Sequence, residues 1–262
     1  MSSDKQRRAA RAEQMRQERE KAARKQRNLI SVAIVIVVAV LIGLGAWGVK
    51  AASDDDAAGP FVAPAHVTDD WGVLYTPEIA TGEAPKTDPV VVQLYEDFVC
   101  PGCGALEQSS ASFLEAAVQS GEIAIDYRPF SFLHEQSTND YSQRAMNAAM
   151  CVLDEGGVPA FVAMHSMLFQ NQPAENTAGP DDRELLGLAL QAGVSDIDSC
   201  VHDQKFTPWV ERAKSAGEKA GVSGTPTVRV GGKDVQGPVV SGREGIPGPT
   251  ELQAAIDAAK AS

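Results

Sequence analysis

The sequence predicts an α/β fold with a helical insertion, preceded by one apolar helix long enough to cross a membrane. Three observations predict it. A β-branched run at 90–95 is followed by a helix and a second strand, the stretch from 141 to about 220 shows only helical signals, and the run 29–49 carries no ionisable side chain. The hydrophobic content of 44% excludes a wholly disordered chain.

The predicted domain opens with a strand, a helix and a second strand. Residues 90–95 form a continuous apolar run after Pro89, typical of a strand buried on both faces. Pro101 suits the first position of a helix, and the apolar residues behind it keep helical spacing until Gly121. Residues 123–127 supply the second strand, so we expect a parallel, right-handed unit.

A helical insertion and a short C-terminal unit complete the domain. The insertion is predicted at about 138–220, where Met, Phe and Leu recur at helical spacing and form its core. Residues 227–230 alternate like a strand, and Gly231-Gly232 predicts a hairpin turn. A last helix is expected from Pro249 to Ala261.

The N-terminal residues predict a membrane anchor. Residues 1–28 carry ten Lys or Arg against four Asp or Glu, and 29–49 is an uncharged apolar run of 21 residues. A spanning helix needs about 20 residues, and the excess of positive charge marks the cytoplasmic side. We therefore expect a single-pass protein of the cell membrane, with a cytoplasmic N-terminus and an extracytoplasmic body. The alternative is a cleaved signal peptide, whose apolar region is shorter, at about 7–15 residues.

Residues 50–66, rich in Ala, Asp, Pro and Gly, are predicted to be a flexible tether, and 67–262 to be the folded domain. Beyond residue 28 the chain has 13 basic and 31 acidic residues. An acidic body argues against nucleic acid as a partner outside the cell, because contact with phosphate needs a basic face.

Two cysteines in Cys100-Pro101-Gly102-Cys103 carry the predicted chemistry. They stand one helical turn apart where a buried strand meets a helix N-terminus, and the free N–H groups and helix dipole there stabilise a thiolate. A reactive dithiol is the expected result. The same spacing forms half of a zinc site, but Cys151 and Cys200 stand alone and do not supply the second half.

Cys151 and Cys200 both fall in the helical insertion. Four cysteines allow three connectivities, and the short spacing favours Cys100 with Cys103, which leaves Cys151 with Cys200 as a structural disulfide. An extracytoplasmic location permits disulfides. Two buried free thiols that pack as small hydrophobic residues are the alternative.

The segment 95–103 (YEDFVCPGC), the helical insertion and Gly224-Thr225-Pro226-Thr227-Val228 together resemble the membrane-anchored, DsbA-like thiol-disulfide oxidoreductases of actinobacteria. The resemblance covers the whole predicted outer domain. It implies a thioredoxin fold, a second disulfide between Cys151 and Cys200, and a cis bond between Thr225 and Pro226 beside the active disulfide. An ordinary trans proline turn is the alternative that the sequence alone leaves open.

These features predict a dithiol oxidase that introduces disulfides into reduced exported polypeptides. Cys100 is expected to be the exposed thiol, Cys103 its partner, and Thr225 the residue that offers its backbone to the substrate. The sequence has no flavin, quinone or nicotinamide motif, so we expect no cofactor. The resemblance implies a quinone-linked membrane partner similar to vitamin K epoxide reductase. The alternatives are a reductase or isomerase of the same fold, and a tethered binding or chaperone module with only structural disulfides.

Two positions depart from the family pattern. Leu94 stands where thioredoxins and enterobacterial DsbA proteins carry a buried acid, so the proton of Cys103 needs another carrier. Glu96 and Asp97 are the nearest carboxylates, and the sequence leaves open whether they tune the thiol or are solvated at a strand end. Gly102 replaces the His or Ala of many relatives.

No further catalytic group is expected. Three histidines lack the spacing for a cysteine-histidine hydrolase, namely His134, His165 and His202. His165, in the helical insertion, is expected to be a packed or surface residue. We expect no metal, and a monomeric domain.

Overall fold

The computed structural model describes residues 61–240 and 243–261. The predicted basic tail 1–28, membrane span 29–49 and tether residues 50–60 lie outside the described residues. Within the described ranges, no helix is long and apolar enough to cross a membrane.

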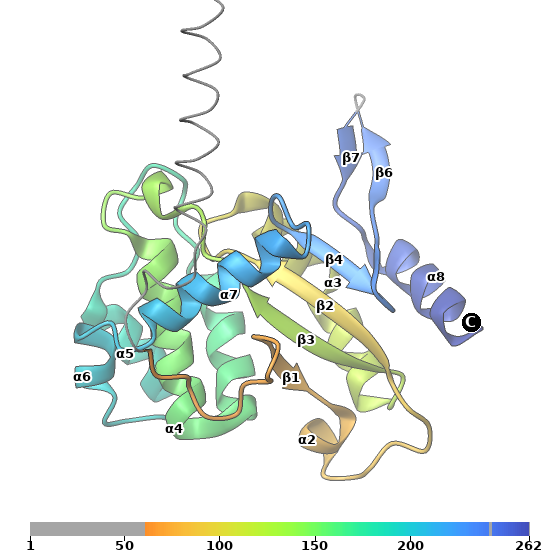
Figure 1. Cartoon of the computed structure of the whole chain (residues 1–262), viewed down its shortest axis with the longest axis horizontal. Coiled ribbons are helices and arrows are strands. Elements are labelled where there is room, and N and C mark those ends of the chain that lie inside the picture. The colour runs from red at the N-terminus through yellow and green to blue at the C-terminus, as the bar shows by residue number, and fades with distance from the viewer. Residues whose placement is uncertain (1–60, 241–242, 262) are drawn as a thin grey trace, which may run out of the picture. The chain divides into compact units, whose positions relative to one another are not determined.

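The described residues form a five-stranded sheet, a separate two-stranded hairpin and flanking helices (Figure 1). The strands of the sheet are β1 (Val73–Tyr75), β2 (Val90–Glu96), β3 (Ile123–Pro129), β4 (Thr227–Val230) and β5 (Lys233–Asp234). The hairpin is β6 (Gly237–Val240) and β7 (Arg243–Gly245). The helices are α2 (Pro77–Thr81), α3 (Pro101–Gln119), the short 3-10 helix η2 (His134–Gln136), α4 (Tyr141–Gln170), α5 (Asp182–Gln191), α6 (Asp198–His202), α7 (Thr207–Lys219) and α8 (Pro249–Lys260).

The sheet has the order β1-β3-β2-β4-β5, with β2 at its centre. β2 and β3 run parallel, with Leu94 opposite Tyr127, while the other neighbours pair antiparallel. The predicted parallel strand-helix-strand unit is therefore confirmed. The predicted turn at Gly231-Gly232 joins β4 to β5, and both glycines have positive φ, as a tight hairpin turn requires.

Helices cover both faces of the sheet (Figure 1). α3 and α8 contact each other and lie on one face, against β3 and against β2 and β4 respectively. α7 covers the other face, where an added side chain at Gly217 would overlap Phe130 and Tyr95. β2 is consequently buried on both sides, and Val92, Leu94 and Tyr95 are each at most 4% exposed.

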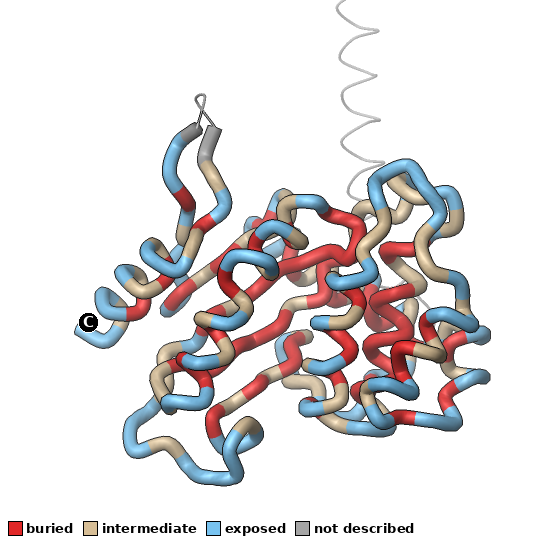
Figure 2. Tube along the Cα trace, turned by 180° about the vertical axis from the view of Figure 1, so that it is seen from behind, coloured by how far each residue is buried: buried red, intermediate tan, exposed pale blue. Residues whose placement is uncertain are grey.

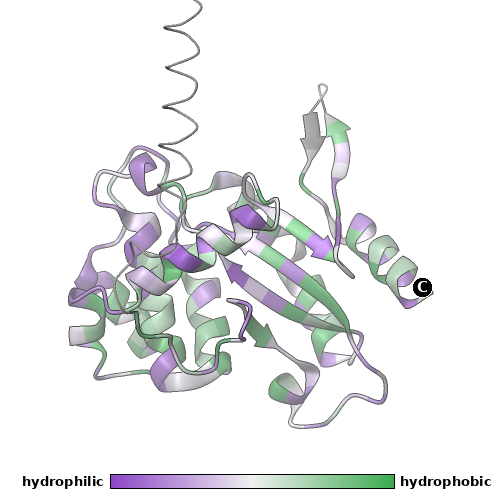
Figure 3. Ribbon diagram, in the orientation of Figure 1, coloured by the Kyte–Doolittle hydropathy of each residue, from purple (hydrophilic) through white to green (hydrophobic). Residues whose placement is uncertain are grey.

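The helical insertion consists of α4, α5, α6 and α7, close to the predicted range of 138–220. α4 bends at Gly157, whose φ of 73° is left-handed, two residues before Pro159. Figure 2 shows buried residues along the inner sides of these helices, and Figure 3 shows hydrophilic residues on their connecting loops. The insertion and the sheet share one hydrophobic core, whose largest fully buried side chains include Trp209, Tyr141, Phe98, Phe161 and Phe206.

A disulfide joins Cys151 on α4 to Cys200, which lies on α6. The two cysteines are 49 residues apart, so the bond closes a long loop within the insertion. In the chain-entropy model such a loop contributes about 4 kcal/mol to stability. The insertion is thus cross-linked independently of the sheet.

Several short elements were absent from the sequence-based prediction, and one boundary differs from it. β1, α2, η2 and the hairpin β6–β7 are short and carry little periodic signal. Residues 61–66, predicted to belong to the tether, instead pack on the domain. The Phe61 ring lies 5.6 Å from that of Trp71 and under the guanidinium of Arg212, and the Ala65 N–H donates to Asp154.

Candidate active site

Cys100 and Cys103 lie at the N-terminus of α3, at the end of the central strand. Cys100 is the N-cap residue, with extended backbone, and Pro101 is the first residue of the helix. Both thiols are free, and Cys100 is 7% exposed whereas Cys103 is fully buried. An attacking thiol from outside therefore meets Cys100 first.

The loop before β4 lies directly beside Cys100. The Thr225–Pro226 peptide bond is cis, and the Cys100 thiol donates a hydrogen bond to the Thr225 carbonyl at 3.3 Å. The structure thus brings together the four residues expected at the active site. Cys151 and Cys200 belong to the insertion and form their own disulfide.

The two thiols differ strongly in acidity. The pKa of Cys100 is lowered to about 6, chiefly because the Cys103 thiol donates a hydrogen bond to its sulfur. Burial raises this pKa, whereas the Thr225 side chain and the backbone N–H groups of Cys103 and Gly102 lower it further. The Thr225 hydroxyl is buried and has no other partner, so it is free to turn toward the thiolate. Burial, followed by the bond to Cys100 and the charge of Glu96, raises the pKa of Cys103 far above its usual range. The lowered pKa makes Cys100 the more reactive thiolate of the pair, and the raised pKa keeps Cys103 protonated when the pair is reduced.

A steric constraint explains why glycine stands at position 102. A Cβ at this position would lie 2.9 Å from Pro226 and 3.6 Å from both the Cys100 sulfur and Ile246, which follows β7. The space next to the cysteines that a side chain would use is therefore occupied by Pro226 and Ile246.

Gln172, just after α4, fastens the active-site backbone. Its side-chain amide donates to the carbonyls of Phe98, at 3.1 Å, and Cys100, at 2.9 Å. A Cβ at Gly104 would lie 2.3 Å from the Gln172 amide oxygen, so a side chain there would push the amide away from these carbonyls. No local pattern predicts this contact, because Gln172 lies far along the chain in a loop.

Asp97 is fully buried and accepts four hydrogen bonds. One oxygen accepts from the Val99 N–H at 2.8 Å. The other accepts from the N–H groups of Phe132 and Leu133 and from the Ser142 hydroxyl, at 2.7–2.9 Å. Solvation of Asp97, one of the two interpretations left open, is therefore wrong; this side chain ties the end of β2 to the loop after β3 and to α4.

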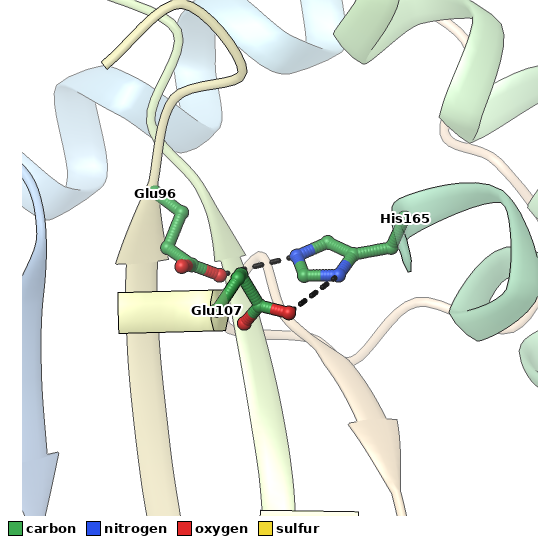
Figure 4. Close-up of side chains that lie close together, drawn as sticks. All are labelled: Glu96, Glu107 and His165. Atoms are coloured by element: carbon green, nitrogen blue, oxygen red, sulfur yellow. Dashed lines mark hydrogen bonds and ion pairs between the residues drawn. The ribbon is translucent and has the colours of Figure 1, made fainter. Parts of the chain in front are cut away.

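Glu96 is also buried, at 4% exposure, and meets two groups that the sequence did not connect with it. Figure 4 shows Glu96 from β2, Glu107 from α3 and His165 from α4 pointing toward one another. The His165 Nε2 lies 3.1 Å from Glu96, and its Nδ1 lies 4.0 Å from Glu107. We call these three residues the buried triad; its Glu107 stands one turn after Cys103, a spacing that places both on one face of a helix.

Burial governs the acidity of the buried triad. It raises the pKa of Glu96 to about 8, with a smaller effect of Cys100, and raises the pKa of Glu107 to about 7, with a further effect of the Glu96 charge. Burial lowers the pKa of His165. Four aromatic rings surround the imidazole at centroid distances of 4.6–6.0 Å, those of Phe98, Tyr127, Phe161 and Phe169.

The acidity of Cys100 can be measured by the ultraviolet absorbance of its thiolate. The reduced protein is expected to titrate with a midpoint of about 6. In Cys103→Ala the midpoint rises toward the free value of roughly 8.5, because the main hydrogen-bond donor is lost. Cys100→Ser, the control, lacks this transition. A wild-type midpoint at the free value contradicts the assignment of Cys100 as nucleophile.

Replacement of Asp97 by Asn tests its role at the end of β2. The amide puts a donor against N–H groups, so we expect the free energy of unfolding to fall by about 3 kcal/mol. Denaturant titration of the reduced and oxidised protein measures this. Asp154→Asn is the matched control, because that half-exposed carboxylate also accepts a backbone N–H and pairs with Lys205, and it should cost less than about 1 kcal/mol. Equal losses in both variants would contradict the proposed importance of Asp97.

Comparison with known proteins agrees with this architecture. The family model described as thioredoxin matches residues 77–258. The serine/threonine-protein kinase PknE of Mycobacterium tuberculosis is 33% identical over 118 residues, which are 43% of this chain and 21% of PknE. The chain therefore matches only about a fifth of the length of these curated relatives.

Solved structures match over a larger share. The reduced form of the disulfide bond oxidoreductase DsbG from Mycobacterium tuberculosis is 30% identical, with a TM-score of 0.60, over 79% of this chain and 92% of that one. Oxidised DsbA of the same organism is 32% identical, with a TM-score of 0.58, over 73% and 93%. The chain belongs to the thioredoxin family, among the DsbA-like thiol-disulfide oxidoreductases.

Proposed function

We propose that this protein is a thiol-disulfide oxidoreductase that acts as a dithiol oxidase on exported polypeptides. The observation that carries the proposal is the asymmetry of the cysteine pair. Cys100 was expected to be the exposed thiol, but it is buried, with only 7% of its surface accessible at the helix N-terminus, and its thiolate is stabilised. Cys103 is fully buried and its thiolate is disfavoured. Stabilisation of the Cys100 thiolate favours the reduced enzyme, and a disulfide whose reduced form is favoured is a strong oxidant.

The reaction starts from the Cys100–Cys103 disulfide. A substrate thiolate attacks the Cys100 sulfur, the disulfide breaks, and Cys103 departs and takes up a proton. A second thiolate of the substrate attacks the substrate sulfur of the mixed disulfide and displaces Cys100 as a thiolate. The substrate loses two electrons and gains a disulfide, while the enzyme becomes the dithiol seen in the structure.

The Thr225 carbonyl is the group that holds the substrate chain. It lies 3.3 Å from the Cys100 sulfur, at the start of β4. In the mixed disulfide Cys100 no longer carries a proton, so this carbonyl can accept a backbone N–H of an extended substrate instead. Substrate recognition at this point requires no particular side chain, which suits an enzyme with many clients.

Electrons must leave the reduced enzyme before the next turnover. We place the reoxidant in the membrane, as a quinone-linked protein similar to vitamin K epoxide reductase. Support comes from the apolar run 29–49 and its basic flank, which would hold the domain and the partner at the same surface. Restriction to one surface raises their effective concentration.

The reduction potential separates an oxidase from a reductase. For the full-length protein equilibrated with glutathione we expect about −120 to −180 mV, the range of dedicated oxidants and isomerases. Cys100→Ser is expected to abolish the oxidation of a reduced two-cysteine peptide. A potential near −270 mV, the thioredoxin level, would instead make the protein a reductase. An unreactive Cys100 would favour a binding module whose cysteines are only structural.

The membrane orientation can be tested with single added cysteines in a Cys100→Ser/Cys103→Ser background. Ser3→Cys is expected to react with a membrane-impermeant maleimide only after the cells are permeabilised, because the basic tail is cytoplasmic. Ser53→Cys, beyond the predicted span, should react in intact cells. Labelling of both positions in intact cells would exclude this topology, and loss of the N-terminal residues from the mature protein would indicate a cleaved signal peptide.

A further inference from the structure

We propose that His165 joins Glu96 and Glu107 into a proton path that carries protons between Cys103 and the surface groove between α3 and α4. The proposal rests on the proposed thiol-disulfide chemistry, in which Cys103 gains a proton on reduction and loses it on oxidation. It is carried by the contacts within the buried triad, by the one-turn spacing of Cys103 and Glu107 on α3, and by the partial exposure of Glu107.

The two ring nitrogens of His165 face different carboxyl groups. A neutral imidazole has one N–H donor and one bare nitrogen. With the N–H of Nε2 donated to a Glu96 carboxylate at 3.1 Å, the bare Nδ1 faces Glu107, whose carboxyl must carry a proton to bond it. The opposite tautomer moves that proton to Glu96. The buried triad therefore holds one carboxyl proton, which lies on Glu107 in one tautomer of the imidazole and on Glu96 in the other.

The inner end of the path is Glu96. One of its oxygens contacts His165, and the other is buried without a hydrogen-bond partner. The charge of Glu96 is one of the causes that disfavour the Cys103 thiolate, so the two groups interact electrostatically. When Cys103 departs from the disulfide, a protonated Glu96 becomes a carboxylate as the thiolate becomes a thiol.

The outer end of the path is Glu107. Its side chain is 12% exposed, against 5% for Glu96 and 6% for His165. It lines a groove of about 670 Å³ together with residues of α3 and of the C-terminal part of α4, among them Gly104, Ser166 and Phe169. The distance of 4.0 Å between the Glu107 carboxyl and Nδ1 is longer than a hydrogen bond. A small rotation of the Glu107 side chain would bring its carboxyl into contact with the ring, and the reverse rotation would return it to the groove.

The complete step is balanced in protons. A reducing thiolate attacks Cys100, and Cys103 departs. The Nε2–H of His165 protonates Glu96 while Nδ1 takes the proton of Glu107, and Glu96 then passes its proton to Cys103. Water in the groove reprotonates Glu107, and return of the ring proton from Nδ1 to Nε2 restores the starting state. Reoxidation of the enzyme runs the same path outward. Thr225 and Pro226 do not line the groove, so a substrate bound to their loop leaves the proton path open.

The nearby cation does not neutralise the carboxyl groups of the buried triad. Tyr127 on β3 lies against the imidazole, with the ring centroids 4.6 Å apart. Arg128 is the one cation among the described residues that line the small cavity beside Glu96 and His165, and its guanidinium is paired with Asp70 and Asp126. One ligand atom from each member of the buried triad lies within 4.8 Å of the other two, as in a metal site. The two carboxyl groups nevertheless face opposite nitrogens of the ring, so one metal ion cannot replace both of these contacts.

The test uses the full-length protein and no protein substrate. Stopped-flow fluorescence follows the reduction of the Cys100–Cys103 disulfide by dithiothreitol across the pH range, in H2O and in D2O. The rate per dithiothreitol thiolate in the wild type is expected to fall as the pH rises through about 7 and 8, where Glu107 and Glu96 lose their protons. A solvent isotope effect should accompany it.

Glu107→Gln, at the edge of the buried triad, is expected to slow this reaction at least about 10-fold, within the range for loss of an acid-base group, and to remove both the pH dependence and the isotope effect. Glu107→Asp restores part of the rate because it keeps the carboxyl group. His165→Gln gives the same loss if circular dichroism shows it folded. Glu115→Gln is the matched control, since Glu115 lies on the same helix but bonds Tyr75 and Gln119.

Wild-type pH dependence and isotope effect in Glu107→Gln would overturn the proton path, whatever the outcome for His165→Gln. So would an equal loss in Glu115→Gln. A failure of the proposed oxidase function has a different signature. In that case the wild type does not oxidise the reduced peptide, while the reaction with dithiothreitol still reports the transfer of protons to Cys103.

Discussion

The position of the active site depends on the buried negative charge of Asp97. Three backbone N–H groups and one hydroxyl converge on it from the turn after β2, the loop after β3 and the start of α4. The Asp97 carbonyl also accepts the N–H of Cys100, at 3.0 Å. Because hydrogen bonds to a buried charge are stronger than neutral ones, a shift of any of these segments is costly. The sheet and the insertion meet at this carboxylate, and Cys100 is placed by it.

Adjacent acids in the chain have opposite surroundings. Asp97 has all its hydrogen-bonding capacity used by fixed donors and contributes to the framework. Glu96, one residue earlier, points to the other side of the backbone turn, where it has one partner and a bare oxygen among aromatic rings. A carboxyl with few donors in such a place retains its proton to higher pH. Of these two neighbouring residues, Asp97 thus holds the structure together and Glu96 is placed for proton chemistry.

Local patterns predicted the parallel unit, the insertion, the hairpin turn and the last helix, because buried strands and amphipathic helices leave periodic signals in consecutive residues. The cysteine pair also has a local signature at the start of a helix. The buried triad has none, since Glu96, Glu107 and His165 come from three elements and meet only through tertiary packing. The contact of Gln172 with the active-site backbone could not be predicted, for the same reason. Leu94 indicated that the proton of Cys103 needed another carrier but not which residue it was, and β1 and the β6–β7 hairpin were too short to show a period.

The close approach of Pro226 and Ile246 to Gly102 links three distant parts of the sequence. A side chain at 102 would lie beside the Cys100 sulfur, at 3.6 Å, where it could alter the redox behaviour of the pair. Such a change is restricted, because a Cβ at 102 would lie only 2.9 Å from Pro226 and would have to displace it. Evolution or engineering of the dipeptide in this protein therefore has to proceed by paired changes, with a shift of the loop that carries Pro226 accompanying a side chain at 102.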